Sequence, residues 1–248
     1  MYKRLYNIEA LFKSIQNQQF KDFDVFIVNN NSSQEASKAI ESHLSRLERR
    51  QVFNLEVNHG AYVRYVLAKK LNEIGYDFGV FIDDDEELKP TSMGLFLKDA
   101  TKQGIRSIRN LHIEEGGRMS MAREGFPCNV CNAGGMVIDL SLFTKQSFWD
   151  EWLTCYRSQD DLWISYYAGK IGWSLGKAHA EVILDGRNGD SDSMYKKPGQ
   201  NVVERAFLAE FYRGKPIDVE RIVKTKLGLK AQATYPKKVS IMNAPWRQ

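Results

Sequence analysis

Residues 76–88, with the sequence Tyr-Asp-Phe-Gly-Val-Phe-Ile-Asp-Asp-Asp-Glu-Glu-Leu, decide the fold of this chain. The apolar run at residues 78–82 is short and bounded by polar residues, which is typical of a buried β-strand. Five consecutive acids follow it, at residues 83–87. Like charges held so close repel one another, and burial raises their pKa values, unless a cation compensates them. The stretch therefore predicts a strand with a metal site at its exit.

On both sides of this stretch, short apolar strands alternate with amphipathic helices. Strands are predicted over residues 23–28, 53–57, 105–111, 133–138 and 182–184, and helices over residues 8–19, 36–47, 63–74, 91–100, 162–168 and 202–212. Strands that alternate with helices at this spacing predict an α/β fold, with a doubly wound, mostly parallel sheet flanked by helices. The last helix and the tail predict a small C-terminal helical extension.

Composition limits the class of protein. The chain has 248 residues, 43% of them hydrophobic, which is enough for one sizeable α/β domain with a small appendage. The net charge of +4 comes from interspersed charges of both signs, so nothing indicates a nucleic acid partner. No apolar run reaches the ~18–20 residues of a membrane span, and no signal-peptide core is present. We expect a cytoplasmic protein, with peripheral membrane contact left open.

The three cysteines do not form a recognisable metal site. Cys128 and Cys131 are spaced like zinc ligands, but only Cys155 remains elsewhere, so a four-thiolate site cannot be completed. We expect reduced thiols without a ligand.

Polar residues follow three of the predicted strands, at residues 29–31, 58–60 and 83–85. In a doubly wound sheet, ligands bind outside the carboxyl ends of the strands, so these residues should share one edge. Asp83 and Asp85 could hold Mg²⁺ or Mn²⁺ and leave coordination sites for diphosphate oxygens. The alternative is a solvated acidic turn.

Further candidates for chemistry lie outside the acidic cluster. Asp160 or Asp161 could act as a general base, and capping of the following helix is an equal alternative. Arg64 could bind a diphosphate through charge-assisted hydrogen bonds, although a lone helix arginine is usually solvated. Paired glycines at Gly134 and Gly135 allow a ligand to approach the backbone closely, or form a tight turn.

Five segments, in this order, resemble the family 2 glycosyltransferases with the nucleotide-diphospho-sugar-binding GT-A fold. Ordered co-occurrence is more specific than any single motif, and the likeness spans roughly residues 3 to 190. The segments are residues 11–18 (first helix), 24–33 (second strand and base-binding turn), Asn58-His59-Gly60 (Asn-x-Gly), 81–85 (Asp-x-Asp), and Gly134-Gly135 followed by Asp160-Asp161 (acceptor glycines and catalytic pair).

The resemblance implies that a sugar moves from a nucleotide diphosphate donor to a hydroxyl of a glycan or other acceptor, with inversion and with Mn²⁺ or Mg²⁺ as cofactor. It implies a nucleotide-sugar half at residues 1–90, an acceptor half at 91–200 and an extension at 201–248. The implied donor-binding residues are Arg4, Asn29, Asn30, Asn58, Gly60, Arg64, Asp83 and Asp84. The other implied site residues are Asp160 and Asp161 (catalytic, with Asp160 as the base), Asp83 and Asp85 (metal), and Gly134, Gly135, Trp149 and Trp152 (acceptor, where core packing is the equal alternative for both tryptophans).

The chain departs from the family pattern in three places. Asn29 and Asn30 stand where the family usually has acids, and Arg64 lies one residue closer to Asn58 than the usual arginine. The family also begins with a central strand, of which only residues 2–4 resemble the end. We therefore expect an N-terminally shortened product, and direct pairing of the strands around Val25 and Val80 would refute this hypothesis.

Two other functions remain as alternatives. The first is a non-catalytic nucleotide- or glycan-binding protein with a degraded GT-A fold. The second, ranked last, is a sugar-phosphate nucleotidyltransferase, because no Gly-rich phosphate loop with Arg and Lys is present. We also expect the glycine-bearing loop at residues 115–132 to order over the donor and exclude water.

Overall fold

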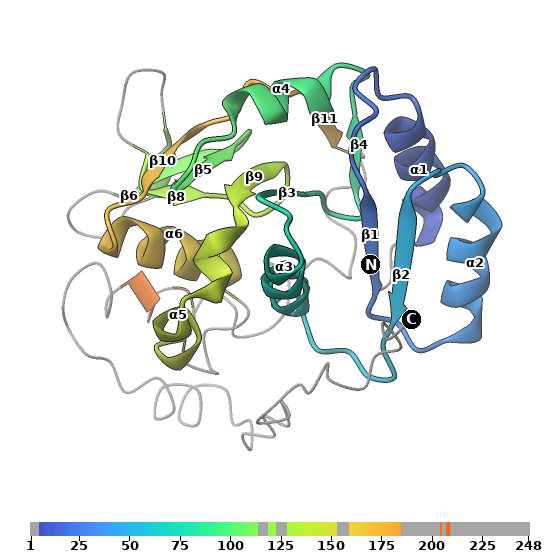
Figure 1. Cartoon of the computed structure of the whole chain (residues 1–248), viewed down its shortest axis with the longest axis horizontal. Coiled ribbons are helices and arrows are strands. Elements are labelled where there is room, and N and C mark those ends of the chain that lie inside the picture. Colours follow the sequence, from blue (N-terminus) through green and yellow to red (C-terminus); the bar gives the residue numbers. More distant parts are fainter. Residues whose placement is uncertain are drawn as a thin grey trace.

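The computed structural model describes residues 5–113, 119–122, 128–152 and 159–184 and the separate residues 204, 207 and 208. The predicted helix at 202–212 thus lies largely outside the described residues. Among them, the helices are η1 (Leu5–Asn7), α1 (Ile8–Gln16), α2 (Gln34–Leu44), α3 (Val63–Glu73), α4 (Ser92–Asp99), η2 (Leu140–Thr144), α5 (Gln146–Asp150) and α6 (Asp160–Lys170) (Figure 1). The strands are β1 (Val25–Asn29), β2 (Arg50–Asn54), β3 (Phe78–Phe81), β4 (Glu86–Leu88), β5 (Gly104–Ser107), β6 (Asn110–Ile113), β7 (Met119–Met121), β8 (Val130–Cys131), β9 (Met136–Asp139), β10 (Ser174–Lys177) and β11 (Val182–Leu184).

The strands form one four-stranded sheet and three smaller ones. The four-stranded sheet has the order β10-β5-β9-β3, and β1 and β2 form a separate pair. Strands β1 and β2 are parallel, as are β5 and β10, whereas β9 is antiparallel to both of its neighbours. Strand β4 pairs with β11, and β6 pairs with β7 and β8. The predicted α/β class with flanking helices is confirmed, and the four-stranded sheet is mixed.

Two predicted strands differ from the observed ones. Strand β2 ends at Asn54, because its register with β1 runs from Arg50 to Asn54, so the prediction of residues 53–57 was displaced towards the C-terminus. The single strand expected at 105–111 is instead two strands, β5 and β6. The Ser107 hydroxyl causes the break, because it accepts from the Arg109 N–H and donates to the Asn132 carbonyl, which turns the chain between the two strands.

The core lies on both faces of the four-stranded sheet. Met136 and Ile138 of β9 face a large aromatic cluster with α3, α5 and α6, while Val137 between them faces a second cluster with α4. A third cluster joins α1, α2 and β1. Helices therefore cover both faces, as a doubly wound arrangement requires.

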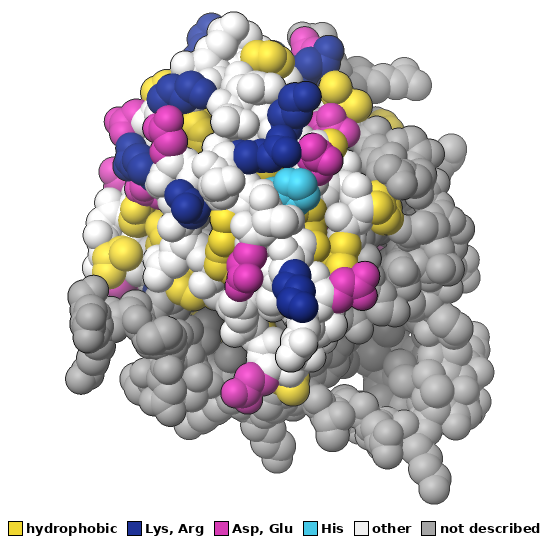
Figure 2. Space-filling view, turned by 90° about the vertical axis from the view of Figure 1, so that its right-hand side faces the viewer, with side chains coloured by type: hydrophobic (Ala, Val, Ile, Leu, Met, Phe, Trp, Pro, Cys, Tyr) yellow, Lys and Arg dark blue, Asp and Glu magenta, His cyan; other side chains and the backbone are white. Residues whose placement is uncertain are grey.

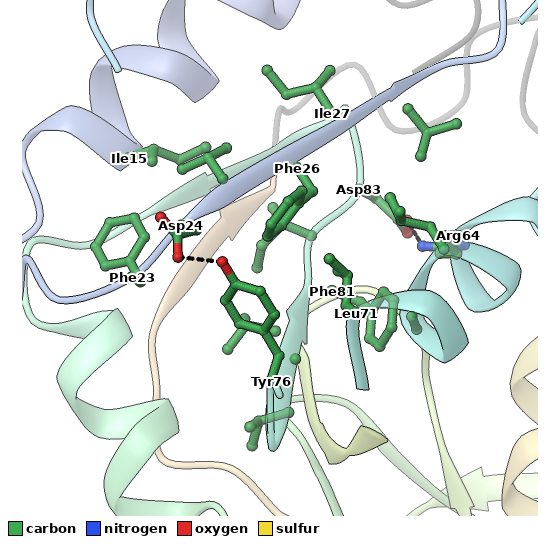
Figure 3. A pocket seen from close by; sticks show the side chains of 18 of the residues that line it. Ile15, Phe23, Asp24, Phe26, Ile27, Arg64, Leu71, Tyr76, Phe81 and Asp83 are labelled. Carbon is green, nitrogen blue, oxygen red and sulfur yellow. Dashed lines mark hydrogen bonds and ion pairs between the residues drawn. The ribbon is translucent and has the colours of Figure 1, made fainter. Parts of the chain in front are cut away.

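A cavity of about 760 Å³ separates β1 from β3, and both strands line it (Figure 3). The Val25 N–H donates to the Arg49 carbonyl, and the Asn29 carbonyl accepts from the Leu55 N–H. The peptide groups of Val25 and Asn29 therefore face β2, and those of the alternate residues of β1 face the cavity. The side chain of Tyr76 reaches across and donates to Asp24 Oδ2 at 2.5 Å. Strands β1 and β3 do not pair directly.

The outer surface over α1 and α2 carries charges of both signs in a mixed arrangement (Figure 2). This distribution agrees with the interspersed charges of the sequence. In the part of the chain that the structure describes, no helix is both long and apolar enough to cross a membrane.

Candidate functional site

The acidic residues after β3 lie at one end of the cavity, where Asp83 and Asp84 line the wall. A turn connects them to β4, in which the Glu86 N–H donates to the Asp83 carbonyl and the Asp83 N–H donates to Glu86 Oε2 at 2.9 Å. Asp85 lies in this turn and is half-buried. The turn thus fixes the backbone of Asp83 through a carboxylate that is itself fully buried.

Arg64 connects the acidic turn to a second carboxylate. It lies in the first turn of α3, and its Nη1 donates to Asp83 Oδ1 at 2.7 Å while its Nη2 donates to Asp160 Oδ2 at 3.2 Å. Figure 3 shows the Arg64 and Asp83 side chains directed towards each other at the cavity wall. Burial opposes the ionisation of Asp83, but the charges and hydrogen bond of the nearby arginines prevail and lower its pKa. The Asp83 carboxylate and the Arg64 guanidinium are therefore both charged at neutral pH.

Asp160 begins α6 without capping it. The N-cap position is Gln159, which makes no side-chain capping hydrogen bond, and the Asp160 carboxylate instead accepts from the Tyr65 hydroxyl at 2.6 Å. The adjacent Asp161 accepts from the Leu162 N–H. Burial, and then the charge of Asp160, raise the pKa of Asp161 to about 7. Capping by Asp160, the alternative weighed from the sequence, is not observed, and this acid faces the same cation as Asp83.

Gly134 lies where Asp83, Glu86 and Arg109 meet. A Cβ atom built at Gly134 would be 2.6 Å from Arg109 Nη2, 2.6 Å from Glu86 Oε1 and 2.7 Å from Asp83 Oδ2. Arg109 also pairs with Glu86, and burial together with the charge of Asp83 raises the pKa of Glu86 to about 8. A side chain at position 134 would therefore displace the ends of these three side chains. At Gly135 a φ of +63° favours glycine.

Sequence reasoning missed Tyr65, Glu86 and Arg109. Glu86 was counted only as part of the acidic run, Arg109 lay within a predicted strand, and Tyr65 read as an ordinary position of a helix. A buried carboxylate at the start of β4 and an arginine at the break between β5 and β6 become neighbours only after folding. In the sequence, Tyr65 was marked only by its place next to the candidate Arg64.

The asparagines after β1 and β2 join two turns. Asn30 Nδ2 donates to the Gly60 carbonyl at 3.0 Å, and Asn30 Oδ1 accepts from the His59 N–H at 2.9 Å. Asn29 Nδ2 donates to Asn54 Oδ1, and Asn58 Oδ1 accepts from the Gly60 N–H. The two turns predicted to share an edge are thus brought together, with the Asn29 and Asn30 side chains bonded within the protein.

The tryptophans are part of the aromatic core. Trp152 is 4% exposed and its ring stacks on that of Trp163, with centroids 6.2 Å apart. Trp149 is half-buried, and its Nε1 donates to the Phe143 carbonyl at 2.7 Å. This geometry is that of core packing, the alternative stated for both residues. Arg4 and half of the loop at 115–132, namely residues 115–118 and 123–127, lie outside the described residues.

The acidic turn suits a cation that shares its ligands with a substrate. Nowhere in the described ranges do three or more His, Cys, Asp or Glu side chains gather in a group that could hold a metal ion. Mg²⁺ and similar ions, however, commonly use one or two carboxylates and complete their shell with water and phosphate oxygens. Asp83 lines the cavity, and Asp85 lies two residues later in the same turn. Carboxylates of this kind would fit a metal that takes its remaining ligands from a diphosphate.

Comparison with known sequences gives a family match over the first half of the chain and a curated relative. Residues 1–122 match the family model described as "Glycosyl transferase family 2". The GalNAc(5)-diNAcBac-PP-undecaprenol beta-1,3-glucosyltransferase of Campylobacter jejuni is 27% identical over 124 residues, which are 50% of this chain and 40% of that protein. The chain thus spans less than half of the length of this curated relative.

Comparison with solved structures extends the likeness to nearly the whole chain. GalNAc-T7, crystallised with UDP, GalNAc and Mn²⁺, aligns with a TM-score of 0.55 at 11% identity, over 90% of this chain and 52% of that one. TarS 1-349 from S. aureus, in complex with UDP, aligns with a TM-score of 0.52 at 13% identity, over 98% of this chain and 74% of that one. At such low identity the likeness establishes the fold, which is of the GT-A type.

Proposed function

Because residues 1–122 match the model of glycosyl transferase family 2, we propose that the protein transfers a sugar from a nucleotide-diphosphate donor to a hydroxyl group of a glycan or other acceptor. The observation that carries the proposal is the Arg64 bridge, which joins Asp83 at 2.7 Å and Asp160 at 3.2 Å. The acid implied on the donor side and the acid implied as base therefore lie within reach of one guanidinium. A donor diphosphate and an acceptor hydroxyl could meet there.

In the proposed reaction, the acceptor oxygen attacks the anomeric carbon of the donor sugar while the bond from this carbon to the diphosphate breaks. The nucleoside diphosphate leaves with the bonding electron pair, and Asp160 takes the acceptor proton. Positive charge develops on the sugar as in glycoside hydrolysis. Attack from the face opposite to the leaving group inverts the anomeric centre, which is the outcome we propose.

The leaving diphosphate needs positive charge, and this chain can place two arginines near it. Arg64 already contacts Asp83, and Arg109 lies beside the same carboxylate. Asp85, together with Asp83, would hold Mn²⁺ or Mg²⁺, which when bound neutralises the charge of the diphosphate. Because the described residues offer few ligands, we propose that metal affinity depends on the presence of donor.

One observation favours the alternative of a non-catalytic protein with a degraded GT-A fold. The Asn29 and Asn30 amides, implied to contact the nucleoside, are engaged with other protein groups. If they remain so, the nucleoside would be held weakly. Calorimetry that shows donor binding without hydrolysis or transfer would support this second function.

The test begins with a panel of UDP-, GDP- and dTDP-sugars with and without Mn²⁺, because a bound ligand raises the melting temperature by mass action. Donors that stabilise the protein are then assayed for transfer to glycan and lipid-linked glycan acceptors. We expect Asp160→Asn to reduce transfer by about 10²- to 10⁴-fold, the usual contribution of a general base. Asp150→Asn, at the end of α5, is the matched control and should be neutral. Full transfer by Asp160→Asn would remove Asp160 as the base.

A further inference from the structure

The Asp160 carboxylate is held through one of its two oxygens. Tyr65 Oη donates to Asp160 Oδ2 at 2.6 Å, and Arg64 Nη2 donates to the same oxygen at 3.2 Å. No other described residue donates to this carboxylate within hydrogen-bonding distance. Oδ1 is therefore the oxygen that remains for a proton from outside the protein.

We infer that Tyr65 is a positioning residue for sugar transfer, which holds Asp160 by Oδ2 so that Oδ1 receives the acceptor proton. The inference rests on the proposed function, in which Asp160 is the base. It assigns to Tyr65 a role that depends only on its hydroxyl group. A fixed base keeps the acceptor proton, the acceptor oxygen and the anomeric carbon in a reactive arrangement, and a misplacement of about 1 Å can cost 10²-fold in rate.

The ring of Tyr65 is fixed by its packing. The side chain is fully buried, and its ring centroid lies 5.3 Å from that of Phe81, 5.3 Å from that of Phe143 and 6.0 Å from that of Trp152. These neighbours come from β3, from η2 and from the segment after α5, so the ring is enclosed from three directions. The hydroxyl thus stands at a defined position without support from a ligand.

The hydroxyl is a donor under all conditions in which the protein would act. Burial, and then the neighbouring carboxylate, raise the pKa of Tyr65 well above its ordinary value, although the Arg64 charge opposes this. A protonated phenol beside a carboxylate oxygen donates to it. Hydrogen bonds to a charged acceptor are shorter and stronger than those between neutral groups, and the 2.6 Å distance to Asp160 agrees with this.

Tyr65 and Arg64 both bond to Asp160, but they differ in their bonds to other groups. Arg64 is shared between Asp160 and Asp83, so a donor diphosphate would compete with the carboxylates for its guanidinium, and a metal would compete with Arg64 for Asp83. Among the described residues, the Tyr65 hydroxyl bonds to Asp160 alone. When Arg64 turns towards a phosphate, Tyr65 is the contact that keeps Asp160 in place, and this separates a positioning role from mere neutralisation of charge.

The test is Tyr65→Phe, which removes the hydroxyl and retains the ring. Tyr167→Phe is the matched control, because Tyr167 is also fully buried in the aromatic cluster and its hydroxyl bonds to Ser147 at 2.5 Å, away from the carboxylates. We expect Tyr65→Phe to lower kcat for transfer by about 10- to 100-fold, with the donor Kd and KM within about twofold of wild type. Tyr167→Phe should leave kcat unchanged.

A second measurement tests whether Tyr65 acts through Asp160. In the Asp160→Asn background, Tyr65→Phe should have no further effect on the residual kcat, because groups that act as a unit are not additive. Wild-type kcat in Tyr65→Phe, or an equal loss in both backgrounds, would overturn the inference and leave the proposed function standing. If the wild-type protein transfers no sugar from any donor in the panel, the proposed function fails, and the role assigned to Tyr65 fails with it.

Discussion

The two sides of the cavity each contain an arginine that bridges two aspartates, and they differ in burial. On the β1 side, Arg49 bonds to Asp22 at 2.7 Å and to Asp24 at 2.7 and 2.9 Å, and its side chain is 51% exposed. On the β3 side, Arg64 bridges Asp83 and Asp160 and is 21% exposed. The same arrangement of charges is thus built once in solvent and once at a partly buried site.

Burial decides what each bridge can do. Water screens the Arg49 bridge, so it should contribute little to stability and little to the charge of any ligand. The Arg64 bridge lies where the effective dielectric constant is lower, and its charges act on each other and on a bound anion more strongly. The comparison supports placing the proposed chemistry on the β3 side.

The largest expected difference between the two sides is the loss of stability when each bridging arginine is removed. Arg64→Met leaves Asp83 and Asp160 without their shared cation, and we expect the free energy of unfolding to fall by about 3 kcal/mol, the lower end for a broken buried pair. Arg49→Met is the matched control, and its effect should be barely measurable because that bridge is exposed. Urea denaturation followed by tryptophan fluorescence measures both. Equal losses in the two variants would show that burial does not distinguish the sides.

A methyl group at Gly134 should have the next largest effect. The Cβ of Gly134→Ala would lie 2.6–2.7 Å from side-chain atoms of Arg109, Glu86 and Asp83, so these side chains must move apart. We expect kcat/KM for transfer to fall by about 10²-fold, as for a misplacement of about 1 Å. Gly94→Ala in α4 is the control, because its Cβ would meet only Phe20, at 3.8 Å. An unchanged kcat/KM in Gly134→Ala would show that the position of the cluster is unimportant.

Local patterns in the sequence were sufficient to predict the elements that the two sides share. The apolar run before Asp83, the periodic helices and the polar strand exits are signals that a few neighbouring residues carry, and they led to the α/β fold. The displaced β2 shows the limit, because its bounds depend on pairing with β1. The break at Ile108 likewise depends on contacts of Ser107 with a segment more than twenty residues away.

The candidate site could be predicted only in part, for the same reason. Asp83, Asp160 and Arg64 were named from motifs, but only the fold shows that one guanidinium joins the two acids. The hydroxyl of Tyr65 donates to a carboxylate that lies 95 positions further along the chain. No pattern within a helix could show this contact.

The smallest expected effect is on the pH dependence of stability, to which two aspartates, one on each side of the cavity, contribute with opposite signs. Asp161, on the β3 side, has its pKa raised to about 7 by burial and by Asp160. Asp24, on the β1 side, has its pKa lowered from its ordinary value of 3.8, chiefly by its hydrogen bond to Arg49. The folded protein therefore holds a proton on Asp161 between about pH 4 and pH 7 that the unfolded chain has released.

From this difference, the contribution of Asp161 to the free energy of unfolding should fall as the pH rises from 4 to 7, by at most about 1.4 kcal/mol per pH unit for one proton. Asp161→Asn should abolish that slope. The contribution of Asp24 has the opposite sign, because it is complete above pH 4 and is lost as the pH falls through the lowered pKa. Asp24→Asn should therefore reduce the pH dependence of stability only below about pH 4. Urea denaturation at pH steps from 3 to 8 separates the two variants. An unchanged slope between pH 4 and 7 in Asp161→Asn would mean that this acid is ionised in the folded protein, and that the β3 side carries one more negative charge for its arginines to neutralise.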